Sequence, residues 1–260
     1  MLLDPISMIL VLIGIGVGAG ALGSVLGVGG GIIMVPALTF LGLPPPHVAS
    51  TSLFAVTSTS VSSTIEYSRQ KRIDYKLGIQ LSALAIPGAI VGAFVSDYLT
   101  EGSFKLAFGI LLVLTGLYIL YRNSILKEGS ESSRKQPAHV MIAVFAATFG
   151  AGLISSVFGV GGGIIFVPIM LLVMKMTMQR AAPTSQLTLM ITSIAGVLTH
   201  SFLGHPDYIQ AIALSAGAFA GAQVGARLSK SAKDVLLQRL LGIALIGVAV
   251  KFILDWFSSR

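Results

Sequence analysis

Long stretches of this chain contain no charged side chain, and this feature constrains its fold more than any other. Asp, Glu, Lys and Arg are all absent from 5–65, 77–96, 106–121, 136–174, 181–206 and 208–226. About 20 apolar residues are enough to cross a bilayer. With 54% hydrophobic and only 10% charged residues, the composition is far from that of a soluble globular domain. The sequence predicts an all-α, polytopic integral membrane protein.

Composition and charge exclude several other classes. The chain has no cysteine, which rules out disulfides, thiolate metal sites and cysteine nucleophiles. Its net charge of +7 lies in short segments between apolar runs, which favours membrane orientation over nucleic-acid binding. His and carboxylate residues are not clustered, so we expect no metal, no cofactor and no enzyme active site. The apolar start lacks a preceding basic region, so a cleaved signal peptide is not expected.

A duplicated Gly-rich motif divides the chain into two related halves. Segment 18–36 matches segment 150–168 at a shift of 132 residues, with 14 of 19 positions identical. Weaker matches continue at a shift of 133; Asp74, for example, aligns with Asp207. The duplication predicts one transmembrane repeat over 1–122, a cytoplasmic linker over 123–137 and a second repeat over 138–260.

Each half begins with a Gly-rich segment and continues with three conventional helices. The Gly-rich segments are 6–43 and 138–174, and the helices are expected at 47–67, 75–97, 103–121, 181–203, 208–228 and 233–256. The glycines divide each such segment into an arm of about 21 residues and an arm of about 12, and the short arm covers only about 18 Å of a core about 30 Å thick. We therefore expect a broken hairpin, with Pro36 and Pro168 kinking the short arms.

The basic residues favour an inverted relation between the halves. If each Gly-rich segment crosses twice, each half has five crossings, and only Lys105, Lys251 and Arg260 of the 17 Lys and Arg residues lie apart from the other 14. If each segment crosses once, the halves are parallel bundles of four helices, and the basic residues divide 10 to 7. The positive-inside rule favours inversion, with both chain ends outside. The parallel arrangement stays the alternative.

The glycines of both motifs form the candidate anion site. A helix that starts inside the membrane presents unpaired amides and the positive end of its dipole to an anion. Broken helices at matching places in two halves are typical of a transporter's binding site. Close packing of small residues is the alternative reason for the glycines. The candidates are Gly27, Gly29, Gly30, Gly31, Gly159, Gly161, Gly162 and Gly163.

Polar side chains just after each short arm complete the candidate site. The hydroxyls of the first turn of the next helix point to oxyanion binding or, equally, to helix N-capping. One glutamine breaks the repeat, because it aligns with Leu53, and its amide is expected to orient the ligand. These residues are Thr51, Ser52, Thr184, Ser185 and Gln186.

The two motifs resemble the hallmark of the sulfite exporter TauE/SafE family, also called the 4-toluene sulfonate uptake permease family. They run from Gly27 to Pro36 and from Gly159 to Pro168, and an Ala-x-Thr-Ser follows each motif. The resemblance covers essentially the whole chain. It implies a multi-pass inner-membrane transporter of bacteria or archaea that moves sulfite, sulfonates or related anions. The family is often described with about eight helices, from which the ten-crossing interpretation departs.

A secondary carrier or facilitator for a small anion is the favoured function, with export the expected direction. A channel-like pore and a membrane scaffold or accessory subunit are the alternatives. The expected partners are the anion and the lipid bilayer, and the oligomeric state, for example a homodimer, is not fixed by the sequence. Acids such as Glu66 and Asp97 lie at helix ends, so proton or sodium coupling is not indicated. His47 is expected at the surface and His200 at the membrane interface.

Overall fold

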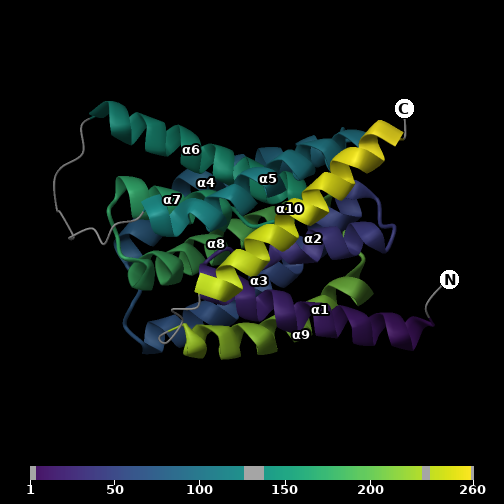
Figure 1. Cartoon of the computed structure of the whole chain (residues 1–260), viewed down its shortest axis with the longest axis horizontal. Helices are drawn as coiled ribbons and strands as arrows, with labels where there is room; N and C mark the ends of the chain where they lie inside the picture. Colours follow the sequence, from purple (N-terminus) through teal and green to yellow (C-terminus); the bar gives the residue numbers. More distant parts are fainter. Residues whose placement is uncertain (1–3, 126–137, 230–234, 259–260) are drawn as a thin grey trace.

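The computed structural model describes residues 4–125, 138–229 and 235–258, and all regular structure in these ranges is helical (Figure 1). This confirms the all-α class. The elements are α1 (Pro5–Leu26), α2 (Gly31–Phe40), α3 (Pro45–Arg69), α4 (Tyr75–Ser96), α5 (Glu101–Ile125), α6 (Ala138–Phe158), α7 (Gly163–Pro168), the π-helix η1 (Ile169–Val173), α8 (Met178–Phe202), α9 (Tyr208–Leu228) and α10 (Val235–Ser258). Helix α5 extends to Ile125, and the rest of the expected linker lies outside the described residues.

Left-handed glycines separate α1 from α2. Gly27 caps α1 with φ 76°, and its amide donates to the carbonyls of Gly23 and Ser24. Gly29 and Gly30 also have positive φ, at 81° and 84°. An L-residue with a side chain is strained in this region, and glycine is not. The chain therefore reverses within four residues and starts α2 inside the molecule.

The second short arm has a different helical form. After the turn that contains Gly159 (φ 71°) and Gly161 (φ 75°), α7 lasts only to Pro168 and continues as the π-helix η1. Proline has no N–H for the helical hydrogen bond, and its ring clashes with the preceding turn. The wider π-turn follows directly, whereas α2 passes Pro36 and remains α-helical.

Helices from opposite halves of the chain pack against each other. Helix α1 lies beside α9, and α6 lies beside α4 (Figure 1). Glycines make both contacts close: Gly217 and Gly221 of α9 lie against the backbone of Ile13 and Val17 in α1. Because the contacts advance in the same order along both helices, α1 and α9 run parallel. Helices α3 and α8 meet between these two pairs.

The loops lie at two ends of the bundle. The guanidinium of Arg72, after α3, donates through Nε to the carbonyl of Gln179 at the start of α8, at 2.8 Å. At the other end, His205 after α8 contacts Asp97 after α4. The basic residues of the first end whose side chains the structure describes are Arg69, Lys71, Arg72, Lys76, Lys175, Arg180 and Arg227, and this end is here called the basic end. The second is called the histidine end, and the start of α1 and the end of α10 lie there together (Figure 1).

Apolar side chains cover the outside of the bundle, as a bilayer requires. Five helices are long and apolar enough to cross a membrane within the described ranges, and they include α1, α4 and α9. Large apolar side chains on these helices face outward, for example Leu10, Phe94 and Ile212. Apolar side chains that face lipid acyl chains are not exposed to water and do not destabilise the protein. The chain is therefore a multi-pass membrane protein.

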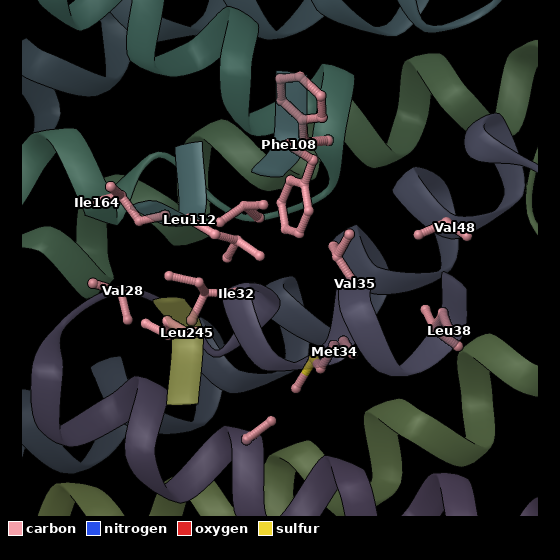
Figure 2. Packing of buried hydrophobic residues seen from close by; sticks show 14 of the residues in the cluster. Val28, Ile32, Met34, Val35, Leu38, Val48, Phe108, Leu112, Ile164 and Leu245 are labelled. Atoms are coloured by element: carbon pink, nitrogen blue, oxygen red, sulfur yellow. The ribbon is translucent and has the colours of Figure 1, made fainter. Parts of the chain in front are cut away.

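The short arms are anchored by an apolar cluster in the bundle interior. Ile32 of α2 and Ile164 of α7 belong to this one cluster, together with Val28 from the first glycine turn (Figure 2). Phe108 and Leu112 of α5 cover it from one side (Figure 2). The two helix breaks are thus held close together in the centre of the structure.

Candidate functional site

The two glycine turns meet each other across the halves of the chain. A Cβ atom on Gly31 would lie 2.5 Å from the carbonyl oxygen of Val160, and one on Gly163 would lie 2.5 Å from that of Gly27. Real Cβ atoms do not approach backbone this closely, so only glycine fits at either position. The sequence-predicted glycines are therefore brought together into one centre.

The alanines that follow each motif are also explained by this centre. A Cβ on Gly27 would lie 2.7 Å from Cα of Ala182, and one on Gly159 would lie 2.7 Å from Cα of Ala49. Each turn packs against the first residues of the long helix from the other half. A larger side chain than alanine would separate the two elements.

Ser52 and Ser185 hold the turns by matched hydrogen bonds. The hydroxyl of Ser52 donates to the carbonyl of Gly159 at 2.7 Å, and that of Ser185 donates to the carbonyl of Gly27 at 2.7 Å. All four residues are buried. Because these hydroxyl protons are engaged with backbone, they position the turns, and other groups must supply donors to an anion.

The two predicted threonines differ from each other. The hydroxyl of Thr184 accepts a hydrogen bond of 3.0 Å from the backbone amide of Asp74, the residue before α4. The hydroxyl of Thr51 is buried and has no hydrogen-bond partner. The repeat is thus broken at this position, and only Thr51 keeps its full hydrogen-bonding capacity.

Val56 and Leu189 close the centre between the turns. A Cβ on Gly29 would lie 3.0 Å from Val56 and 3.2 Å from Leu189, and a Cβ on Gly161 would meet the same two side chains. Val56 and Leu189 are equivalent in the two halves. They form an apolar partition where α3 crosses α8, and polar residues lie on both sides of it.

Buried hydroxyls without hydrogen-bond partners lie along α3 and α8 on both sides of this partition. Sequence reasoning named Thr51 but missed the other four, although α3 is rich in Ser and Thr. An unsatisfied buried hydroxyl costs about 1–3 kcal/mol, so such a concentration needs a reason. Ser60 lies close to a turn, with its Oγ 3.9 Å from the Cβ position of Gly29. The set is Thr51, Thr59, Ser60, Thr64 and Thr192.

Gln186 lies on the same side of the partition as Ser60. Its amide nitrogen donates to the carbonyl of Gly23 at 2.9 Å, next to the first helix break. The side chain is fully buried, and its Oε1 has no partner. Leu53 takes the equivalent place in the other half, where its side chain meets Gly196. The two sides of the partition therefore differ in polarity.

Toward the basic end, Tyr67 and Ser24 continue the polar path. The Tyr67 hydroxyl donates to the carbonyl of Ser24 at 3.0 Å, and Ser63 donates to the Ser24 hydroxyl at 2.8 Å. The guanidinium of Arg72 lies 5.3 Å from the centre of the Tyr67 ring. Burial lowers the pKa of Arg72, but an arginine stays charged in proteins. A permanent cation therefore stands at this end of the path.

Toward the histidine end, His200 occupies the place equivalent to Tyr67. Its Nε2 lies 3.0 Å from the carbonyl oxygen of Ser156, the equivalent of Ser24. The sequence predicts His200 at the membrane interface, near a helix end, and the structure shows that its side chain is completely buried among other helices. The reason is that α8 passes the end of α6, which the sequence of α8 alone does not indicate. His47 is exposed, as expected.

The arrangement is that of a transporter: broken helices meet at the centre of a membrane-spanning bundle, and polar residues lead from the centre toward both ends. The sulfite exporter TauE/SafE family model matches residues 12–252, which is nearly the whole chain. The chain belongs to this family. It is a membrane transporter, and not an enzyme.

Curated relatives agree with this assignment. The probable membrane transporter protein YunE of Bacillus subtilis is 30% identical over 91% of this chain and 94% of its own length. The probable membrane transporter protein MJ0441 of Methanocaldococcus jannaschii is 26% identical over 85% of the chain and 88% of its own length. The probable membrane transporter protein YfcA of Escherichia coli K12 is 25% identical over 87% and 83%. No solved structure matches the chain.

Proposed function

We propose that this chain is a secondary carrier that exports a small sulfur-containing oxyanion or organosulfonate across the inner membrane. The family description names sulfite export, which supports the substrate class. The observation that supports an anion substrate most directly is the pair of glycine turns at the centre, which lie next to buried hydroxyls without hydrogen-bond partners. An oxyanion would accept hydrogen bonds that these groups otherwise lack.

The anion is proposed to bind beside the first turn, on the side of the basic end. Helix α2 runs from Gly31 toward the histidine end, so its free first amides and positive dipole end point toward the basic end. The Ser60 hydroxyl faces the same turn from α3. Gln186 closes the site from α8, with a bond to Gly23 that orients its amide. These groups come from both halves of the chain.

The burial of this site supports a carrier more than a pore. Ser60, Gln186 and Tyr67 are fully buried, as are Ser156 and His200 on the other side of the partition. The conformation is therefore closed toward both ends. Passage requires Val56 and Leu189 to separate, together with an opening at one end at a time, which is alternating access.

We also propose that the halves are inverted repeats and that the basic end faces the cytoplasm. The exchanged packing of α1 with α9 and of α6 with α4 supports a two-fold relation between the halves. The short arms return toward opposite ends of the bundle. The positive-inside rule orients the basic end. An anion from the cytoplasm then meets Arg72 first and the α2 amides next.

The membrane potential is the proposed driving force for export. An interior-negative potential favours exit of an anion by about 2.3 kcal/mol per charge per 100 mV. A divalent oxyanion gains about twice as much. No carboxylate among the described residues lies in the centre between the turns, which agrees with a site that binds an anion.

The test measures uptake of labelled thiosulfate and of a small sulfonate by proteoliposomes. Saturable flux is expected for the carrier. Ser60→Ala and Gln186→Leu should each weaken the apparent affinity about tenfold, equivalent to about 1.4 kcal/mol. Thr57→Ala is the matched control, because this hydroxyl bonds only to the Leu53 carbonyl of its own helix. Flux with unchanged affinity in both test variants would place the site elsewhere, and flux that does not saturate would favour a pore.

A further inference from the structure

A continuous polar chain leads from the surface of the histidine end to the second helix break. Asp97, whose side chain is 40% exposed, lies 2.7 Å from Nε2 of His205. The Nδ1 atoms of His205 and His200 are 2.9 Å apart. The other nitrogen of His200 contacts Ser156, 3.0 Å from its carbonyl oxygen and 3.3 Å from its hydroxyl. The members come from α6, α8 and the loops after α4 and α8.

The short distance between the two Nδ1 atoms means that the pair shares one proton. Two protonated Nδ1 atoms would repel each other, and two unprotonated ones would leave no hydrogen bond. With one proton on the pair, His200 donates from Nδ1 and its Nε2 accepts the Ser156 hydroxyl. When a further proton binds, His205 carries a proton on each ring nitrogen and becomes an imidazolium facing Asp97. Its Nδ1 then donates to Nδ1 of His200, and His200 donates from Nε2 to the Ser156 carbonyl. In the neutral state Nε2 of His200 faces the Ser156 carbonyl oxygen without a proton, whereas in the protonated state both atoms are paired. The geometry therefore fits a chain that binds a proton.

The two ends of the molecule differ in how their cation is held. Arg72 over Tyr67 at the basic end corresponds in the repeat to His205 beside His200 at the histidine end, where the ring centres are 5.1 Å apart. The arginine is charged at every physiological pH. Histidine is the side chain that changes charge between about pH 5 and 8. One end therefore carries a permanent cation, and the other carries a cation only when a proton is bound.

We propose that His200, His205 and Asp97 form a proton-binding site that makes passage of the anion through the histidine end depend on pH. The proposal rests on the proposed function and adds to it the regulation of one half of the path. The bound proton supplies positive charge next to the break at Gly159–Gly163, where an anion must pass. Of the described residues, the charged or titratable groups that act on His200 are His205 and Asp97. The proposal differs from the sequence-based expectation, in which proton coupling is not indicated.

The decisive experiment compares anion flux at different pH values on the histidine-end side of proteoliposomes. Thiosulfate and a small sulfonate are the probes, because sulfite itself takes up a proton in this range. Flux should rise as pH falls from about 8 to about 5, by up to about tenfold per pH unit for one bound proton. His205→Arg should give flux that no longer depends on pH, and His205→Gln should give low flux throughout. Arg72→His is the reciprocal variant and should create pH dependence at the basic end.

A second measurement does not depend on transport. Nitrogen-15 spectra of histidine-labelled protein should show, as pH falls, a proton bound at His205 together with a change of tautomer at His200, with signals assigned from His200→Gln and His205→Gln. Wild-type flux that is the same at every pH would overturn the proposal, and so would imidazoles that stay neutral down to pH 5. If no probe anion is carried at all, the proposed function fails, and the coupled titration alone decides whether the proton site exists.

Discussion

The hydroxyl of Ser52 donates to the carbonyl of Gly159 at 2.7 Å, across 107 positions of the chain. The hydroxyl of Ser185 makes the equivalent bond to Gly27, also at 2.7 Å. Each half of the protein thus fixes the glycine turn of the other. Neither helix break is complete within its own half, which ties the candidate site to the association of both halves.

Removal of these hydroxyls should destabilise the folded protein. Ser52→Ala or Ser185→Ala leaves a buried glycine carbonyl without its donor, at a cost of about 1–3 kcal/mol each. We expect a lower melting temperature in detergent for both variants. Thr57→Ala, on the same helix as Ser52, should change little, because its hydroxyl bonds within the helix. Equal melting temperatures in all three variants would contradict the role given to the two serines.

Substitution of the glycines should show which of them are in close contact. Gly31→Ala and Gly163→Ala place a Cβ about 2.5 Å from a carbonyl oxygen of the other turn, so little folded protein should be recovered. Gly14→Ala in α1 is the control, since nothing lies within 4 Å of its Cβ position. The measurement is the monodisperse fraction in size-exclusion chromatography. A normal yield of Gly31→Ala would mean that the turns do not meet as described.

One glycine from each helix break should affect transport. Gly30 has φ 84°, and its Cβ would lie 2.5 Å from the Ala19 carbonyl oxygen, so Gly30→Val should disrupt the start of α2. Gly162 has an ordinary φ of −62°, and Gly162→Val meets Ala151 and Phe166 at 2.9 Å. Both variants should lose anion flux, and Gly162→Val should retain more folded protein. Normal flux in both would make these glycines packing residues only.

The inverted arrangement predicts opposite accessibility for two equivalent loops. Lys71 and Gly204 are related by the repeat, and both have positive φ, at 56° and 75°. A cysteine should fit at Gly204, because Lys71 already holds a side chain in this conformation. In a chain without native cysteine, Lys71→Cys should label from the cytoplasm and Gly204→Cys from outside. Labelling of both from the same side would restore the parallel arrangement.

Flux of a divalent anion should follow the membrane potential. The potential is clamped in proteoliposomes with potassium and valinomycin. A potential of 100 mV shifts the transport equilibrium by about 4.6 kcal/mol if thiosulfate crosses alone as a divalent anion, and by about half of that if one proton crosses with it. Reversal of the potential should reverse net flux in either case. Flux that ignores the potential at constant pH would rule out electrogenic export.

Local sequence was enough to predict the helices and their interruptions. The expected conventional helices correspond to observed ones within a few residues, as in α9, which was expected at 208–228 and begins and ends there. The glycine motifs interrupt helices because successive glycines adopt positive φ without strain. The expected N-capping role of Thr51 and Ser52 did not appear; no side chain caps α3. The helix starts before these residues, at Pro45, since proline is well suited to a first turn.

The sequence alone determined that this is an all-α membrane protein with two matching glycine breaks, since length, hydropathy and glycine content act within one segment. Only the tertiary structure decided which polar groups meet. Ser52 reaches Gly159, and His200 reaches His205 and Asp97, because helices far apart in the chain pack closely through small residues. A hydrogen bond depends on distances of a few tenths of an ångström, and the pattern along one helix carries no information about its neighbour. The proton site was therefore invisible until α4, α6 and α8 were placed together.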